Sequence, residues 1–197
     1  MKIRYNAPVV LNYALIAVLV LFLNPIVGGN LIPSWFVVPG RGYFDPESIT
    51  SYVRLFSHIA GHISWEHLLG NFAIILLVGP ILEEKYGSFS LLFMILVTAL
   101  VTGLLNSFLF QGALLGASGV AFMMILLAPF TNTKKGEIPF TFILIIALYI
   151  VKEVFQSFQS NDIAEFAHIA GGFCGSIFGF LKQRHRIKEL KALTNND

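Results

Sequence analysis

The sequence of 197 residues predicts an all-α, polytopic membrane protein with six transmembrane helices. Three observations lead to this fold class: apolar residues (AVILMFWYC) make up 56% of the chain, charged residues make up only 12%, and the mean hydropathy is +0.76. Soluble domains carry roughly 25% charged residues, so the composition argues against a soluble globule and against a disordered chain. The net charge of +2 gives no indication of nucleic-acid binding. The single cysteine, Cys174, excludes an intramolecular disulfide.

Six apolar runs predict the membrane spans. A helix needs about 20 apolar residues to cross the ~30 Å hydrocarbon core of a bilayer. The runs lie at approximately residues 8–27, 64–82, 89–110, 116–130, 138–158 and 163–181, followed by a basic tail over residues 182–197. The first run follows Lys2 and Arg4, as in a cleaved signal peptide, but it is longer than the roughly 7–15 apolar residues of such a peptide. We therefore predict a retained first helix.

The distribution of basic residues predicts the orientation, because cytoplasmic loops carry an excess of Lys and Arg. One set of span ends holds ten of the 13 basic residues: Lys2, Arg4, Lys85, Lys134, Lys135, Lys182, Arg184, Arg186, Lys188 and Lys191. The other set holds three, Arg41, Arg54 and Lys152. Both termini are therefore predicted to be cytoplasmic, which agrees with an even number of spans.

The connection between the first two spans is long, from about Gly28 to His62. It is rich in aromatic residues, among them Trp35, Tyr43 and Phe56, and has few charges. A loop of that length in a compact protein is usually functional. Its composition predicts an element that lies in the outer membrane interface.

Three polar residues fall at similar predicted depths in three different spans. Asn71, Ser118 and His168 lie 11, 12 and 13 residues before the predicted inner ends of the second, fourth and sixth spans. At 1.5 Å per residue, this places them about 17–20 Å above the inner boundary. Because buried polar groups are costly in a bilayer, they are functional candidates by default. The shared depth favours one common site.

The fourth span is too short to cross the membrane alone, so a buried non-helical stretch is expected around Gln111–Leu115. Ser118 then lies at the start of a helix, where unpaired N–H groups favour a developing negative charge. An ordinary N-cap role for Ser118 is compatible with this interpretation. Phe122, one turn later, is placed either to stack on His168 or to fill the core.

Small residues predict close packing between the fourth and sixth spans. Gly171, Gly175 and Gly179 recur every four residues on one helix face, three residues after His168. The segment Gly116-Ala117-Ser118-Gly119 offers a matching small surface. Packing of these two surfaces would bring His168 to Ser118.

Two pairs of polar residues, each with a spacing of four, lie before or within the second span. His67 and Asn71 are four residues apart, so they share a helix face, and both can donate hydrogen bonds. A structural bridge between helices is the alternative for this pair. His58 and His62 are also four apart; at the outer edge we expect them to be water-exposed, with a structural or solvating role.

These residues resemble the rhomboid family of intramembrane serine proteases. The resemblance covers most of the chain and rests on four segments in order: His62-Ile-Ser-Trp-Glu-His67-Leu-Leu-Gly-Asn71, Glu83-Glu84-Lys85-Tyr86-Gly87-Ser88, Gly116-Ala117-Ser118-Gly119 and Ala167-His168-Ile169-Ala170-Gly171. It implies a six-helix rhomboid-like bundle in which Ser118 is the nucleophile and His168 its general base. His67, Asn71 and the Ser118 backbone N–H would form the oxyanion hole, with support from Gly116, Gly119, Phe122, Gly171 and Gly175.

The sequence departs from the family pattern at two positions. Arg54 matches the arginine of the first-loop motif, but the family's preceding tryptophan is Val53 here, and the tyrosine that often follows the nucleophile is Phe122. A ring at Phe122 preserves stacking but offers no hydroxyl. Neither change removes a group of the implied chemistry.

The predicted function is cleavage of single-span transmembrane proteins near the extracytoplasmic face by a Ser–His dyad, since no intramembrane carboxylate is placed to orient His168. We expect a multi-pass protein of a bacterial plasma membrane whose partners are lipids and substrates, with no nucleic acid, no metal and no cofactor. Two alternatives remain open. One is a catalytically silent binder of transmembrane clients; the other is a transporter or channel, which usually shows an internal repeat that is not seen here.

Overall fold

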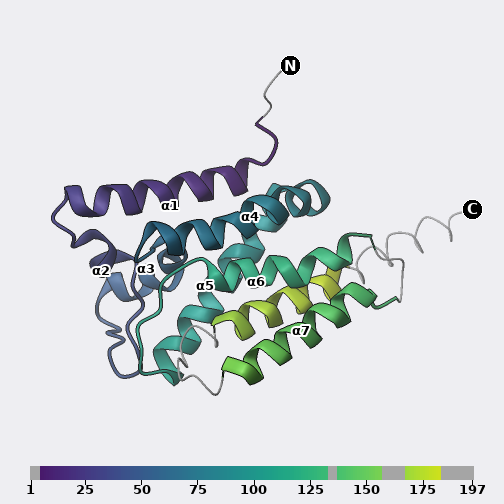
Figure 1. The fold of residues 1–197 in the computed structure, drawn as a ribbon. Coiled ribbons are helices and arrows are strands. Elements are labelled where there is room, and N and C mark those ends of the chain that lie inside the picture. The colour runs from purple at the N-terminus through teal and green to yellow at the C-terminus, as the bar shows by residue number, and fades with distance from the viewer. Residues whose placement is uncertain (1–4, 133–136, 157–166, 183–197) are drawn as a thin grey trace, which may run out of the picture.

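A computed structural model describes residues 5–132, 137–156 and 167–182 (Figure 1). In chain order, its helices are α1 (Pro8–Ile26), α2 (Leu31–Trp35), α3 (Ile49–Ser57), the 3-10 helix η1 (His58–Ala60), α4 (Trp65–Tyr86), α5 (Ser88–Leu109), α6 (Ser118–Leu127), the 3-10 helix η2 (Ala128–Asn132) and α7 (Phe140–Gln156). A further helix, yellow-green in Figure 1, covers residues 167–182. The described residues form no strand; Val38 and Leu114 make one isolated bridge. The predicted all-α class is confirmed.

α1 lies along α4 and is held there by a buried carboxylate (Figure 1). Glu83, near the end of α4, accepts the N–H groups of Val9 and Val10 at 3.0 Å each and the Ser88 hydroxyl at 2.7 Å. The first N–H groups of a helix have no partner within the helix, and the helix dipole favours a negative charge there. Glu83 therefore caps α1 from another helix.

α4 and α5 form a helical hairpin around Gly87. Its φ of +83° is a conformation that glycine adopts readily. α4 begins directly after Ser64, which is its N-cap: the Ser64 side chain accepts the His67 N–H at 3.1 Å. α4 extends to Tyr86, beyond the predicted inner end at residue 82, because Glu83 stays helical while its charge is satisfied by α1.

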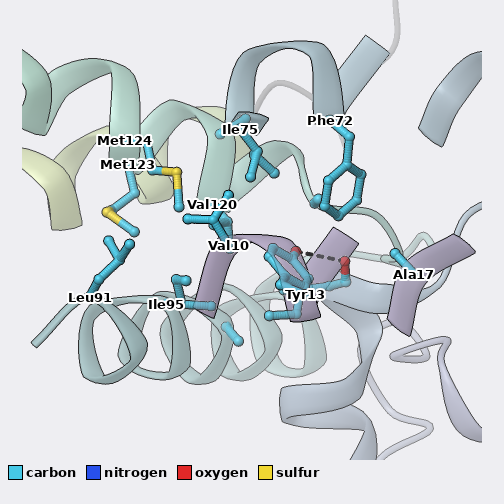
Figure 2. Packing of buried hydrophobic residues seen from close by; sticks show 14 of the residues in the cluster. Val10, Tyr13, Ala17, Phe72, Ile75, Leu91, Ile95, Val120, Met123 and Met124 are labelled. Carbon is cyan, nitrogen blue, oxygen red and sulfur yellow. Dashed lines mark hydrogen bonds between the residues drawn. The ribbon is translucent and has the colours of Figure 1, made fainter. Parts of the chain in front are cut away.

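The core lies between α1, α4, α5 and α6, as Figure 2 shows. Tyr13 of α1 packs edge-on against Phe72 of α4, with ring centroids 5.0 Å apart, and its hydroxyl donates to the Ile59 carbonyl at 2.8 Å. The same cluster includes Val10, Ala17, Ile75, Leu91, Ile95, Val120, Met123 and Met124. α1 is thus an integral part of the packed bundle.

Large apolar side chains also cover the outside of the helices. On α1, Leu15, Leu19 and Phe22 are 54–60% exposed, and Leu77 of α4 is 74% exposed. Soluble proteins rarely expose contiguous apolar surfaces of this extent. Within the described residues, α1, α4 and α5 are long and apolar enough to cross a bilayer, and Ser118–Thr131 is a shorter apolar helix. The chain is an integral membrane protein, and the arrangement is consistent with six spans.

The connection between α1 and α4 is an ordered structure built from α2, α3 and η1. The Arg54 Nε donates to the Ser34 carbonyl at 2.9 Å, and the Ser57 hydroxyl donates to the Trp35 carbonyl, so α3 is tied to α2. Tyr52 and Phe56 on α3 and Trp35 on α2 are exposed. Parts of the last two predicted spans (157–158 and 163–166) and the tail from residue 183 lie outside the described residues.

Candidate active site

The chain before α6 is non-helical, as predicted for Gln111–Leu115, but its burial is only partial, because Gln111 and Ala113 are exposed. α5 ends at Leu109 and α6 begins at Ser118. Between them, Leu114 and Val38 exchange backbone hydrogen bonds of 2.9 Å, and the Gly116 N–H donates to the His58 carbonyl at 2.9 Å. Leu114, Gly116 and Ala117 are buried. Such backbone is tolerated at membrane depth because protein satisfies its polar groups.

Ser118 is the first residue of α6 and not its N-cap. The N-cap is Ala117, and no side chain caps this end of the helix. The N-cap interpretation of Ser118 is therefore wrong by one residue, because the buried loop turns into the helix before the serine. The Ser118 side chain is half-buried at a helix N-terminus, where backbone N–H groups are unpaired.

Glycines bring the helix over residues 167–182 against α6. A Cβ atom at Gly171 would overlap the backbone of Gly119, and one at Gly175 would overlap the Met123 carbonyl. A Cβ at Gly119 would lie 3.2 Å from the Ala167 carbonyl oxygen. The predicted close packing is confirmed, and it sets Ser118 and His168 beside the contact between their helices.

His168 stacks on Phe122. The two ring centroids are 4.3 Å apart and the ring planes are inclined by 18°. Phe122 lies one helical turn after Ser118, so the stack holds the imidazole next to the first turn of α6. Two roles were predicted for Phe122, stacking on His168 or filling the core, and in the structure it stacks on His168.

His67 and Asn71 of α4 line the loop that leads to Ser118. A Cβ at Gly116 would lie 2.8 Å from His67 Cε1, 2.9 Å from His67 Nε2 and 3.7 Å from Asn71 Nδ2. Gly116 has a φ of +117°, a conformation that residues with a side chain rarely adopt. Any other residue here would be strained and would also clash with His67. The structure thus brings both side chains to the backbone two residues before Ser118.

His58 and His62 are buried, which corrects the prediction that they face water. Their side chains are 1% and 0% exposed. His58 Nε2 lies 3.1 Å from the Ala99 carbonyl, while His62 Nε2 lies 3.2 Å from Asn71 Nδ2 and accepts the Ala117 N–H at 3.3 Å. Burial lowers the pKa of His62 from 6.5 to about 4 and that of His58 to about 3, so both are neutral at pH 7.

The family profile described as "Rhomboid domain" matches residues 50–185, which is more than half of the chain. The matched range contains Ser118, His168, His67 and Asn71. The chain belongs to the rhomboid family.

Similar proteins include three bacterial relatives named rhomboid protease GlpG. The one from Haemophilus influenzae is 29% identical over 145 residues, which is 70% of this chain and 73% of the relative. The one from Serratia proteamaculans is 28% identical and the match covers 91% of this chain and 64% of the relative. The one from Pectobacterium atrosepticum is 26% identical, and the match covers 88% of this chain and 62% of the relative. This rhomboid therefore spans less than two thirds of the length of the latter two relatives.

A polar stripe on α5 of this rhomboid was not predicted from the sequence. Thr98, Thr102 and Asn106 are buried and four residues apart. The Asn106 Nδ2 donates to the Gly112 carbonyl at 3.0 Å and to the Pro39 carbonyl at 3.3 Å, so Asn106 holds the loop before α6. The repeat of polar residues every four positions in an otherwise apolar helix was the available signal.

The described residues of this rhomboid contain no group of three or more His, Cys, Asp or Glu side chains arranged to hold a metal ion. At the family's first-loop motif, Val53 is 39% exposed on α3, while Arg54 is bound to the Ser34 carbonyl. The tryptophan-to-valine departure thus falls on an exposed position of α3.

Proposed function

We propose that this rhomboid is an intramembrane serine endopeptidase in which Ser118 is the nucleophile and His168 the general base. Relatives named rhomboid protease indicate a serine protease of the membrane. The observation that carries the assignment is the stack of His168 on Phe122, one turn from Ser118. A nucleophile and its base must lie within reach of each other, with the base oriented by a third group. Here the orienting group is an aromatic ring instead of a carboxylate.

The proposed reaction passes through an acyl-enzyme. The Ser118 oxygen attacks the carbonyl carbon of the scissile peptide while His168 takes the hydroxyl proton. The C–N bond then breaks, and His168 gives that proton to the leaving amine. A water molecule hydrolyses the resulting ester with His168 again as base, which restores both residues.

The proposed oxyanion hole consists of the Ser118 backbone N–H and the side chains of His67 and Asn71. Support comes from their position around Gly116, on the loop that ends at Ser118. Donors fixed before the reaction stabilise the developing negative charge without reorganisation. The positive end of the α6 dipole acts in the same direction.

We further propose that the site opens to the extracytoplasmic side and that both termini are cytoplasmic. Lys85 and Lys182 lie at the end of the bundle where Glu83 caps α1 and where the Lys182 ammonium donates to Ser90 at 3.2 Å. Arg41 and Arg54 belong to the α2–α3 region at the other end. Substrates on this proposal are single-span proteins whose helix unwinds near the outer face.

The decisive experiment compares variants on a single-span substrate in proteoliposomes. Ser118→Ala and His168→Ala should abolish cleavage, because each removes a group that takes part in bond making. Asn71→Ala should lower kcat by about 10²–10³-fold, the usual cost of losing one oxyanion donor. Thermal unfolding in detergent checks that each variant is folded. Full activity in Ser118→Ala would refute the proposal.

Fluorophosphonate labelling separates this function from a catalytically silent binder of transmembrane clients. An activated serine reacts with the fluorophosphonate and forms a covalent adduct. We expect labelling of the native protein and loss of labelling in Ser118→Ala. A folded native protein that binds single-span proteins but is never labelled would favour the silent binder.

A further inference from the structure

We infer that His62 is a positioning residue for the oxyanion hole, which it serves by fixing the side-chain amide of Asn71 and the backbone of Ala117. The inference rests on the proposed function of Ser118 and Asn71. His62 lies before α4, outside the helix that carries His67 and Asn71. It is fully buried, and its ring lies against two rings of α4: the centroid of His67 is 5.1 Å away and that of Phe72 is 5.8 Å away. The ring plane is thus fixed by packing.

The contacts of His62 determine which nitrogen carries its proton. The Ala117 N–H is a backbone donor and lies 3.3 Å from His62 Nε2. A backbone N–H cannot act as an acceptor, so Nε2 must be the unprotonated nitrogen. The proton of the neutral ring then sits on Nδ1, where the Ala60 carbonyl lies 3.4 Å away. Burial, which lowers the pKa of His62, agrees with a neutral ring.

This tautomer selects one orientation of the Asn71 amide. Because Nε2 is an acceptor, the atom of Asn71 that lies 3.2 Å away must be the NH₂ group and not the carbonyl oxygen. The second N–H of the same NH₂ group is then available toward Gly116, which Nδ2 already approaches. If the amide were flipped, its oxygen would face the developing oxyanion and would repel it.

The second contact of His62 is with the backbone of Ala117, the residue before the proposed nucleophile. Ala117 is the N-cap of α6 and precedes Ser118. Its N–H is engaged by His62, while the preceding N–H, of Gly116, is engaged by the His58 carbonyl. Both peptide groups before Ser118 are therefore pinned by the segment around η1. This leaves the Ser118 N–H as the backbone donor for an oxyanion.

A matched pair of substitutions tests whether His62 Nε2 acts as a hydrogen-bond acceptor. His62→Gln can place an amide oxygen about where Nε2 lies, whereas His62→Met has the same chain length but ends in a methyl group. We expect His62→Met to lower kcat by roughly 10- to 100-fold, less than the roughly 10²–10³-fold cost of losing a whole donor. KM should not change, because His62 is buried away from substrate. His62→Gln should restore most of kcat. Equal kcat for both variants would overturn the inference.

A double-mutant cycle shows whether His62 acts through Asn71. In an Asn71→Ala background, His62→Met should lower kcat by a smaller factor than in the native background, because the amide is gone and only the contact with the Ala117 N–H is left to lose. If the effects of His62→Met and Asn71→Ala on kcat simply multiplied, with no coupling between them, the inference would be overturned and the proposed function would stand. An Asn71→Ala variant with native kcat would overturn the oxyanion hole as well. Activity in Ser118→Ala would refute the proposed function itself.

The native protein provides a test that does not depend on the activity of any variant. In ¹⁵N NMR spectra of histidine-labelled protein at pH 7, the His62 ring should be neutral with its proton on Nδ1. The His62→Gln spectrum identifies the signal by its absence. A proton on Nε2 would overturn the inference, since that nitrogen could not then accept from Ala117 and Asn71.

Discussion

At the scale of single residues, an aromatic ring lies against the proposed general base, at the kind of position from which a third group orients the base in a three-member catalytic arrangement. Phe122 stacks on His168 with centroids 4.3 Å apart, and its ring belongs to the same helix as Ser118. Stacking fixes the plane of an imidazole but supplies no charge to a developing imidazolium. The orientation of His168 in the proposed dyad therefore depends in part on this contact.

This dependence predicts the effect of substituting Phe122. Phe122→Leu removes the stack, worth about 0.5–1.5 kcal/mol, and should lower kcat by roughly two- to tenfold. Phe122→Tyr keeps the ring and serves as the matched control, with activity close to that of the native protein. Steady-state cleavage of a single-span substrate measures both. If the leucine variant matched the native kcat, the ring would have no orienting role.

At the scale of helices, the contacts at glycine decide how closely the helix over residues 167–182 approaches α6. Gly171 lies against the backbone of Gly119, and no flexible side chain is there to move aside. Small residues allow this kind of approach between membrane helices, and dispersion and backbone contacts then hold it. The separation of Ser118 and His168 is set by this packing.

Gly171→Ala should therefore separate the two helices and impair both stability and cleavage. We expect a lower midpoint of thermal unfolding in detergent and a loss of most of kcat. Gly70→Ala is the matched control: it is also a helical glycine, but a Cβ there would meet nothing within 4 Å. Alanine favours a helix over glycine by about 1 kcal/mol, so Gly70→Ala should be neutral or stabilising. Equal unfolding midpoints for the two variants would contradict this account.

The link between α1 and α4 predicts a second effect at this scale. Glu83→Gln removes the charge that caps α1 and should lower the free energy of unfolding by about 1–3 kcal/mol. Glu84→Gln, on an exposed position of the same helix, is the control and should change little. Reversible unfolding in mixed micelles provides the measurement. An equal effect of the two substitutions would show that the cap contributes nothing specific.

At the scale of the whole molecule, charge and packing together favour one orientation in the membrane. Glu83, Lys85 and Lys182 lie at the end of the bundle that carries the start of α1, whereas Arg41 and Arg54 lie in the connection at the opposite end. Basic residues are retained on the cytoplasmic side, so the α2–α3 connection should face outward.

Single cysteines test this orientation. The natural Cys174 is buried, so its background reaction with a membrane-impermeant maleimide should be low. In spheroplasts, Tyr43→Cys, at a position that is 76% exposed in the connection, should react without permeabilisation. Glu84→Cys should react only after the membrane is opened. The reverse pattern would invert the predicted topology.

The sequence alone determined that this protein lies in a membrane, and it identified most of the candidate residues. The shortage of charge and the length of the apolar runs fix a membrane protein, because a bilayer imposes simple limits on helix length and polarity. Periodicity of four residues in Gly171, Gly175 and Gly179 predicted the contact with α6, since it is a local property of one helix face. The pairing of His67 with Asn71 followed from the same local rule.

Only the tertiary structure decided the rest, because burial depends on segments that are distant in the sequence. His62 is enclosed by α4 and by the loop before α6, so its own neighbours in the chain gave no sign that it binds Asn71 and Ala117. Glu83, near the end of α4, is buried because N–H groups of the distant α1 bind its carboxylate. The sequence identified polar residues that are costly in a bilayer; long-range packing determined which of them meet, because their hydrogen-bond partners come from other helices.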